Sequence, residues 1–243
     1  MSSNIVKALK LYHQPVAVIY SDTLPAGVSV PKFKGHCCII DWFWKTVLGK
    51  SVAFERDHIP CGGAKGGLCF GDEFAANPKR LAHFLSTGIH GEVEGEHYKK
   101  TPELAYTSWE KLPKVEVKQR YIIFRPLADL APADGKPSVV VFPVNADQLA
   151  AMVVLANYAR PSNDNVIVPF GSGCSTIVRY PYLEGRKRTP RAVIGFTDVT
   201  GRMLHPAEVL TFSVPWKMFL EMDGNVKGSF LDKAVWGKLK KRI

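Results

Sequence analysis

Five cysteines are the residues of this chain whose type and spacing could support metal or redox chemistry. Cys38, Cys61 and Cys69 lie within a short N-terminal stretch, and Cys174 lies far along the chain in a predicted glycine-flanked turn. An odd number of cysteines, with no recognisable signal peptide before them, argues against a framework of disulfide bonds. The pattern predicts thiolates that hold a metal or an iron–sulfur cluster, with reactive or buried thiols as the alternatives.

The segment of residues 61–71 is the strongest part of this pattern, because five of its eleven residues are glycine. Glycine allows positive φ angles and a close approach of the main chain, so amide groups in such a loop can converge on an anion or on cluster sulfides. Lys65 would then balance the negative charge of the cluster. The segment lacks the Gly-Lys-Ser/Thr ending of a phosphate-binding loop, which disfavours nucleotide binding. The expected cofactor-binding residues are Gly62, Gly63, Lys65, Gly66, Gly67 and Gly173.

Two ligand sets for a [4Fe–4S] cluster are compatible with the sequence, because such a cluster needs four ligands, or three and an exchangeable one. In the first set, Cys38, Cys61, Cys69 and Cys174 each bind one iron. In the second set, Cys38, Cys61 and Cys174 hold three irons, and the fourth iron is open to water, sulfide or substrate and acts as a Lewis acid. Zinc is the alternative metal, although the sequence lacks the closely spaced ligand pair of most zinc sites.

Other residues near these cysteines have structural explanations beside the functional ones. His36 and His58 could be alternative ligands or proton carriers. Cys37 is expected to pack in the core. Cys38 would begin a helix, where unpaired N–H groups favour a thiolate, and this suits either a ligand or the nucleophile of a thiol enzyme.

Acidic and aromatic residues are expected to serve the fold. Asp147 and Asp198 are interpreted as cap or turn residues, with an acid or base role as the alternative. Trp42, Phe43 and Trp44 would permit a homo-oligomeric contact, but burial in a helical core explains them equally well.

The formal charge of +10 at pH 7 raises nucleic acid as a partner. The basic residues are not interleaved with aromatic residues in a recognisable module, so specific nucleic-acid binding is disfavoured, and the basic residues 238–242 are expected to form a solvated terminus. No segment approaches the roughly eighteen uninterrupted apolar residues of a membrane span. The composition therefore predicts a soluble, cytoplasmic protein without membrane contact.

Hydrophobic periodicity predicts short helices and strands without a strict βαβα rhythm and without a repeat. Helices are expected at residues 5–12, 38–48, 78–86 and 103–112, after a cap at Asn145, and again from Phe219. Strands are expected at residues 16–20, 51–54, 121–124, 139–142, 166–168, 192–196 and 209–214. The sequence predicts one α+β domain over residues 1–243, with a mixed, largely antiparallel sheet and surrounding helices.

Several short motifs resemble those of one known family. They are Cys61-Gly62-Gly63, Gly67-Leu68, Phe70-Gly71, Asp147-Gln148-Leu149, Leu155-Ala156-Asn157-Tyr158, Gly173-Cys174, Gly195-Phe196-Thr197-Asp198, Leu210-Thr211-Phe212 and Val214-Pro215. Together they resemble the bacterial and archaeal domain family DUF169, over about residues 15–230. By this resemblance, Cys38, Cys61 and Cys174 match cysteines of the family. Cys37 and Cys69 are additions, and position 69 resembles a further glycine.

The expected function is that of an iron–sulfur protein of anaerobic metabolism, because the family name implies no reaction and the cysteines carry the argument. Its role would be electron transfer with a redox partner, sulfur handling, or small-molecule chemistry at an open iron. Two alternatives stay open. One is a metal-free ligand-binding or assembly module whose glycine loop shapes a pocket, and the other is a thiol enzyme that uses Cys38.

Overall fold

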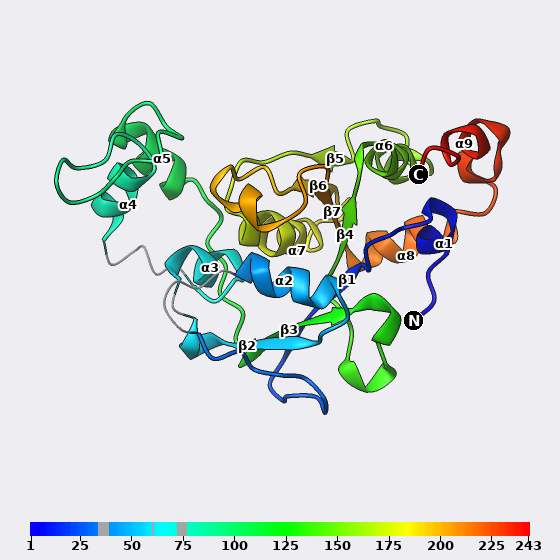
Figure 1. Ribbon diagram of the computed structural model, residues 1–243, viewed down its shortest axis with the longest axis horizontal. Helices are drawn as coiled ribbons and strands as arrows, with labels where there is room; N and C mark the ends of the chain where they lie inside the picture. Colours follow the sequence, from blue (N-terminus) through cyan, green and yellow to red (C-terminus); the bar gives the residue numbers. More distant parts are fainter. Residues whose placement is uncertain (34–38, 60, 72–76) are drawn as a thin grey trace.

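The computed structural model describes residues 1–33, 39–59, 61–71 and 77–243. Within these ranges, seven strands form one sheet in the order β2-β3-β1-β4-β7-β6-β5 (Figure 1). Neighbouring strands run antiparallel except β5 and β6, which are parallel. This architecture confirms the α+β class with a mixed, largely antiparallel sheet. The strands are β1 (Val16–Ser21), β2 (Val52–Glu55), β3 (Tyr121–Pro126), β4 (Val139–Val144), β5 (Val166–Ile167), β6 (Ala192–Gly195) and β7 (Leu210–Pro215).

Strand β4 shows that the sheet is buried on both faces. All six of its residues are buried, and successive side chains of a strand point to opposite faces. Val139 and Val141 pack in one hydrophobic cluster, whereas Val140 and Phe142 pack in another. An unbroken apolar run is what a strand covered on both sides requires.

One side of the sheet, called the α6 face, is covered by helices that pack large apolar side chains. These helices are α1 (Asn4–Leu9), α6 (Ala146–Asn157), α8 (Trp216–Gly224) and α9 (Ala234–Leu239) (Figure 1). Met152 of α6 and Phe219 of α8 are fully buried, and the Phe219 ring lies 6.0 Å from that of Phe142. Full burial of such a side chain contributes about 1.5–3 kcal/mol. Ordinary apolar packing therefore stabilises this face.

Local signals fix the start of α6, as the sequence predicts. The Asn145 side chain accepts a hydrogen bond from Gln148 N at 2.9 Å, and the Gln148 side chain accepts one from Asn145 N at 3.1 Å. This capping box contributes about 1 kcal/mol. Asp147 lies in the first turn and pairs with Arg242 at 3.0 Å, so its role is structural.

The basic residues 238–242 are mostly exposed, as the sequence predicts. The helix α9 that leads into them is attached to the fold, because Trp236 is buried and donates a hydrogen bond to Ala8 O at 3.0 Å. Trp236 therefore helps to attach the C-terminal helix to α1.

The other side of the sheet, called the cysteine face, is covered by α2 (Ile39–Val47), by α3 (Gly62–Gly67) and by a third helix (Figure 1). The third helix consists of the π-helical segment η5 (Ser175–Arg179) followed by α7 (Tyr180–Glu184). Phe43 of α2 lies edge-on to Phe124 and Phe196, and both Phe43 and Trp44 are buried. Core packing therefore accounts for the apolar run of α2.

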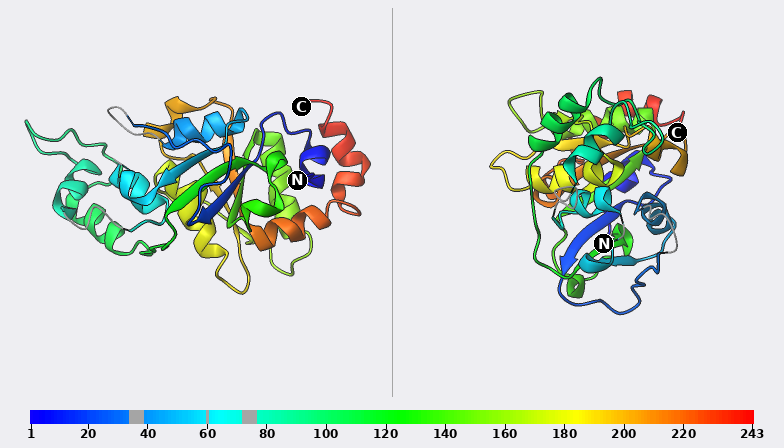
Figure 2. Two further views of the ribbon diagram at one scale, coloured as in Figure 1. Left: turned by 90° about the horizontal axis from the view of Figure 1, so that it is seen from below. Right: turned by 90° about the vertical axis from the view of Figure 1, so that its left-hand side faces the viewer.

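Two helices form an arm that extends away from the sheet (Figure 2). They are α4 (Pro78–Phe84) and α5 (Pro102–Glu110), which pack against each other. Each begins with proline after a capping side chain, Asn77 in α4 and Thr101 in α5. The sequence predicts both helices because these start signals are local.

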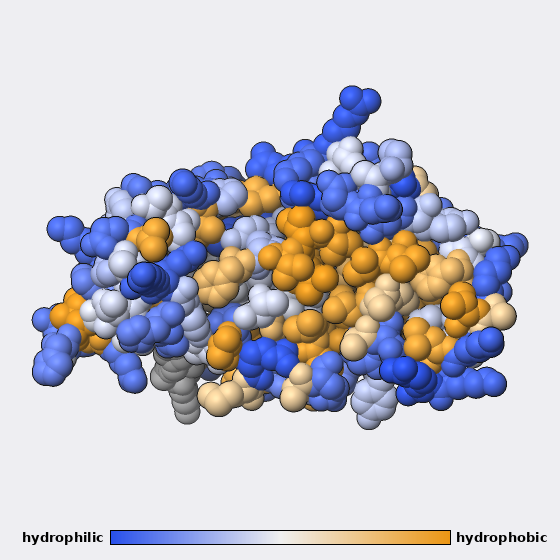
Figure 3. All heavy atoms as spheres, turned by 90° about the horizontal axis from the view of Figure 1, so that it is seen from above, coloured by the Kyte–Doolittle hydropathy of each residue, from blue (hydrophilic) through white to orange (hydrophobic). Residues whose placement is uncertain are grey.

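Apolar side chains also gather on the outer surface seen from above (Figure 3). Val154 of α6 is 51% exposed, and Val168 and Phe170, which follow the edge strand β5, are 60% and 49% exposed. None of the helices in the described part of the chain has the length and hydrophobicity needed to span a membrane.

Candidate functional site

The glycine-rich segment after Cys61 is a helix, and the prediction of a loop is wrong. Cys61 is the N-cap of α3, Lys65 N donates to Cys61 O at 2.9 Å, and Leu68 N donates to Ala64 O at 2.7 Å. Each glycine costs a helix about 1 kcal/mol relative to alanine, which is why the composition indicates a loop. Packing against a second helix outweighs that preference.

The contact between α3 and η5 explains why α3 contains glycine. A β-carbon added at Gly67 would lie 2.6 Å from the β-carbon of Cys174 and 2.9 Å from the nitrogen of Ser175. These separations are shorter than real contacts, so glycine alone lets the two helices approach this closely. The end of α3 is therefore packed directly on Cys174.

Cys174 lies at the start of a helix rather than in the predicted turn, and its neighbour brings α2 to the same place. A β-carbon added at Gly173 would lie 2.8 Å from Cδ1 of Ile40, in the first turn of α2. Ile40 follows Cys38 by two positions in the sequence, and Cys38 itself lies outside the described residues. Two glycine contacts thus join α2, α3 and the helix that carries Cys174.

The helix that carries Cys174 contains one wide turn. Residues Ser175–Arg179 are π-helical, and Tyr180 N donates to Ser175 O. The Thr176 hydroxyl donates to Gly173 O at 3.0 Å and accepts a hydrogen bond from Phe196 N at 3.3 Å. Such wide turns are rare and occur frequently at functional sites. Thr176 therefore anchors this turn to the end of β6.

Asp198 acts as the predicted cap and turn residue. Its carboxylate accepts hydrogen bonds from Gly173 N at 3.4 Å and from Thr200 N at 3.2 Å. Burial raises the pKa of Asp198, although these backbone hydrogen bonds oppose the effect. Asp198 thereby fixes the residue that precedes Cys174.

Cys69 ends α3 in a left-handed conformation, with φ of 63°. Phe70 N donates to Lys65 O at 2.9 Å, and Cys69 N donates to Gly66 O at 3.1 Å. These two bonds form a Schellman motif, whose left-handed position is usually glycine. The motif explains why position 69 resembles a glycine of the family. A residue with a side chain costs about 1–2 kcal/mol there.

The Cys69 thiol is buried in its protonated form. The residue is 0% exposed, and burial raises the pKa of Cys69 to about 11, although a hydrogen bond with Tyr20 and the charges of Arg179 and Arg186 oppose the effect. Burial also raises the pKa of Tyr20 well above its usual value. A metal ligand must be a thiolate, so this environment disfavours Cys69 as a ligand.

The helical form of α3 changes what its glycines can do. Gly66 and Gly67 lie beyond the first turn, where amide groups bond within the helix, so the prediction that they donate to sulfides does not fit. Gly62 and Gly63 lie in the first turn, where amide groups have no acceptor within the helix. The Gly173 amide is bonded to Asp198. Gly67 and Gly173 serve close packing instead, whereas a β-carbon at Gly66 would make only ordinary contacts.

The remaining sequence candidates are not brought together in the described residues. His36, Cys37 and Cys38 lie outside those residues, and His58 is paired with Glu55 at 2.7 Å on the surface. In residues 1–33, 39–59, 61–71 and 77–243, no three His, Cys, Asp or Glu side chains are grouped so that they could hold a metal ion. A ligand set that includes Cys38 stays a prediction.

Comparison with known proteins agrees with the motifs. The family model DUF169, described as Uncharacterised ArCR, matches residues 4–225. The chain belongs to the DUF169 family. No curated protein and no solved structure matches it. The resemblance inferred from the sequence is confirmed over nearly the whole chain.

Three polar side chains of this DUF169 protein join the site without any signal in the sequence. The ring centroids of Tyr20 in β1 and Tyr182 in α7 are 5.5 Å apart, and the Tyr20 hydroxyl donates to Leu68 O at 2.9 Å. Arg179, at the end of η5, is close enough for its charge to act on the Cys69 thiol. Their sequence neighbours contain no motif, because the fold alone brings these elements together.

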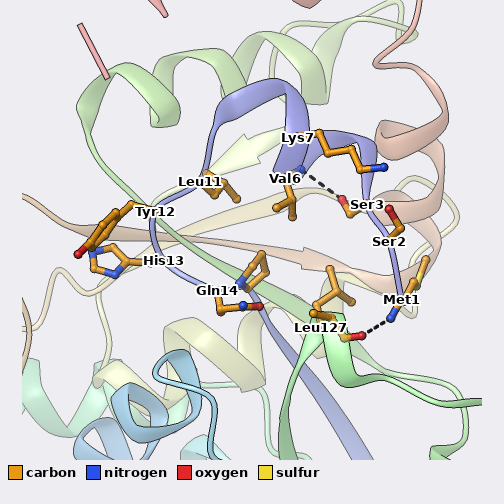
Figure 4. A pocket seen from close by; sticks show the side chains of 12 residues that line it. Met1, Ser2, Ser3, Val6, Lys7, Leu11, Tyr12, His13, Gln14 and Leu127 are labelled. Atoms are coloured by element: carbon orange, nitrogen blue, oxygen red, sulfur yellow. Dashed lines mark hydrogen bonds between the residues drawn. The ribbon is translucent and has the colours of Figure 1, made fainter.

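A separate pocket lies beside α1 on the α6 face (Figure 4). Its volume is about 230 Å³, and its described lining includes the apolar residues Val6, Leu11 and Leu127 together with Lys7 and His13. Burial lowers the pKa of His13, although the charge of Glu208 opposes the effect. No cysteine is among the described lining residues, so this pocket is distinct from the cysteine site.

Proposed function

We propose that this DUF169 protein binds an iron–sulfur cluster through Cys38, Cys61 and Cys174. The observation that supports it most is the packing of Gly67 against Cys174 and of Gly173 against the first turn of α2. These contacts join three chain segments, and each segment contains or directly follows one of the three cysteines. Such close contacts between backbones are what ligands from distant parts of a chain need if they are to meet at one cluster.

The local environment fits thiolate ligands at two of these positions. Cys61 precedes α3, whose first N–H groups have no acceptor within the helix, and Cys174 lies in the first turn of its own helix, where the helix dipole favours negative charge. The amides of Gly62 and Gly63 are available to hydrogen-bond sulfur, and the positive charge of Lys65 opposes the negative charge of the thiolates. A bound cluster would supply one-electron transfer, and an open iron would supply a Lewis acid for a small molecule.

Three cysteine ligands fit the protein better than four. Cys69 is fully buried and its thiol has a pKa of about 11, so formation of a thiolate there is costly. Its position at the end of α3 is also one that favours glycine. We therefore assign Cys69 to the core and leave the fourth coordination position to water, sulfide or substrate.

The surroundings of the site would shield a cluster from solvent. Cys174 belongs to the hydrophobic cluster of the cysteine face, and Cys61 packs against its edge. An apolar shell of this kind controls solvent access and reduction potential. Thiolate ligands require reducing conditions, which favours the cytoplasm as the location. A redox protein or a small-molecule substrate is the corresponding partner.

Anaerobic purification of the wild-type protein and three variants tests the proposal. The wild-type protein is expected to contain iron and acid-labile sulfide and to absorb broadly in the visible range. Cys61→Ser and Cys174→Ser are expected to lose most of the iron, because each removes a ligand. Cys69→Ser is the matched control, since it replaces a cysteine of the same face that is not assigned as a ligand.

Two outcomes would contradict the proposal. One is a folded wild-type protein that contains no iron after anaerobic purification and after reconstitution with iron and sulfide. The other is equal iron content in Cys61→Ser, Cys174→Ser and the wild type, with urea unfolding used to verify that each variant is folded. A requirement for Cys69 as well would favour the set of four cysteine ligands.

A further inference from the structure

Arg179 differs from the other half-buried arginines of the described residues, because it has no hydrogen bond or ion pair with any of those residues. Its Nε atom is buried without an acceptor. Burial of an unpaired N–H group costs about 1–3 kcal/mol, and native proteins rarely leave such a group without a partner. An acceptor for the Arg179 side chain therefore has to come from outside the described residues.

The other half-buried arginines show what this protein normally provides. Arg160 pairs with Glu221 at 2.8 Å, and Arg191 pairs with Glu184 at 3.1 Å. Arg202 donates to backbone carbonyls instead, including Val209 O at 2.7 Å. Arg56 and Arg125 pair with Glu116 and Asp134. Each of these guanidinium groups has an oxygen acceptor, and Arg179 has none within residues 1–33, 39–59, 61–71 and 77–243.

The position of Arg179 links it to the cysteine site. Its Nη1 atom lies 3.8 Å from the point where a β-carbon of Gly66 would be, so the guanidinium group lies against α3. Its guanidinium carbon lies 5.4 Å from the centroid of the Tyr180 ring. This cation–π contact attracts the charge but accepts no N–H hydrogen bond in the guanidinium plane.

The wide turn of η5 also affects where Arg179 points. In an α-helix with 3.6 residues per turn, residues five apart are rotated by about 140° around the axis. A π-helical turn closes between residues five apart, so it brings Arg179 closer to the side of the helix that carries Cys174. The turn therefore directs a positive charge toward the cysteine side of the helix.

We propose that Arg179 binds a small oxyanion at the junction of α3 and the helix that carries Cys174. The planar guanidinium fork can donate two parallel hydrogen bonds to two oxygens of a carboxylate or of a tetrahedral oxyanion. The fork lies against the backbone of α3, because a β-carbon at Gly66 would be in ordinary van der Waals contact with Arg179 Nη1. Use of this oxyanion as a substrate at an open iron rests on the proposed function, whereas oxyanion binding itself does not.

Nuclear magnetic resonance of the arginine Nε–H groups tests the proposal directly. The wild-type protein is titrated with sodium acetate and, separately, with sodium phosphate, with sodium chloride added to hold the ionic strength constant. Arg179→Gln identifies the Arg179 resonance and removes the fork, and Arg179→Lys keeps the charge without the fork. Arg188→Gln is the matched control, because Arg188 is an exposed arginine on the turn after α7.

The Arg179 resonance is expected to shift in a saturable way with at least one of the two anions. The dissociation constant should rise at least tenfold in Arg179→Gln and Arg179→Lys and remain unchanged in Arg188→Gln. A response to acetate alone would identify a carboxylate site, and a response to phosphate alone would identify a tetrahedral oxyanion site. The absence of a saturable shift in the wild-type protein with both anions would overturn the proposal, whether or not the variants fold.

Iron analysis of the same samples separates this inference from the proposed function. Iron-free Cys61→Ser protein is expected to bind the anion through Arg179, and Arg179→Gln protein is expected to retain its iron. Anion binding in a protein that never contains iron would leave the oxyanion site standing and remove the cluster. A protein that contains iron but binds neither anion would leave the cluster standing and remove the oxyanion site.

Discussion

The two faces of the sheet are covered by helices of different kinds. On the α6 face, α6 and α8 bury large apolar side chains such as Met152 and Phe219. On the cysteine face, α3 approaches its neighbour through Gly67, and the helix after Cys174 contains a wide turn. The difference indicates that one face mainly stabilises the fold, whereas the other positions particular groups.

Buried polar atoms mark the same division. In the described residues, almost all buried side-chain polar atoms without a partner belong to the cysteine face or to the chain beside it. They are Trp44 Nε1, Arg179 Nε, Thr197 Oγ1, His205 Nε2, Thr211 Oγ1 and Ser213 Oγ. Arg125 Nη1 is the exception, and it lies 2.9 Å from the Asp134 carboxylate.

Strand β7 contributes apolar side chains to the α6 face and polar side chains to the cysteine face. Phe212 and Val214 point to the α6 face and pack in its apolar cluster. Thr211 and Ser213 alternate with them and therefore point to the cysteine face, where their hydroxyls are buried. Buried polar groups without partners cost stability, so their retention on one face is expected where that face has a function.

The largest expected effect on stability comes from the α6 face. Met152→Ala should lower the free energy of unfolding by about 2–5 kcal/mol, because the side chain is fully buried and its removal leaves a cavity. Urea unfolding measures this loss. Iron content per folded chain should not change, and a parallel loss of iron would show that the two faces are not separate in function.

The Cys69 thiol should make the protein sensitive to alkaline pH. The pKa of Cys69 is about 11 in the folded protein, against an ordinary value of 9.0. Burial of the neutral thiol therefore contributes fully to the free energy of unfolding below pH 9, and this contribution is lost as the pH rises from 9 to 11. The difference corresponds to about 2–3 kcal/mol.

Cys69→Gly tests that pH dependence, because it removes the thiol and suits the left-handed backbone. Urea unfolding between pH 8 and about 11 should show a shallower loss of stability in the variant than in the wild type. Equal slopes would mean that the thiol is not buried in its protonated form, and Cys69 would again be a candidate ligand.

Gly67→Ala should disrupt the contact on which the cysteine site depends. The new β-carbon would overlap Cys174 and Ser175, which costs about 1–3 kcal/mol and separates the helices. Iron content should fall with it. Gly66→Ala is the matched control, because its β-carbon would have 3.5 Å to its nearest neighbour and alanine favours a helix. Similar behaviour of the two variants would contradict the assigned contact.

The failed predictions concern contacts between distant segments. The start of α6 could be predicted because Asn145 and Gln148 are three residues apart and cap each other. The helical form of α3 could not be predicted, because its stability comes from packing against Cys174, more than a hundred residues away. Helix propensity describes local preference alone, and tertiary packing reversed it here.

Only part of the candidate site could be predicted from the sequence. Cys61 and Cys174 could be chosen from residue type and family resemblance, and the structure places them on packed segments. The glycine-like character of position 69 was visible in the resemblance, and its left-handed backbone supplies the cause. Arg179 could not be predicted, because an arginine without a partner can be recognised only when its surroundings are known.

The smallest expected effect on stability comes from a substitution at the start of α6. Asn145→Ala removes one half of the capping box and should lower stability by about 1 kcal/mol. Thermal unfolding should show a modest decrease in the midpoint, with anion binding and iron content unchanged. A change in either would show that the start of α6 influences the opposite face.

Mössbauer spectroscopy of the wild-type protein, after anaerobic reconstitution with labelled iron and sulfide, tests ligation of a cluster by three cysteines. We expect a cubane of about four irons per chain in which one iron differs from the other three, because it has no cysteine ligand. Folded protein that takes up no iron, or four irons that all have thiolate ligands, would contradict a three-cysteine cluster site.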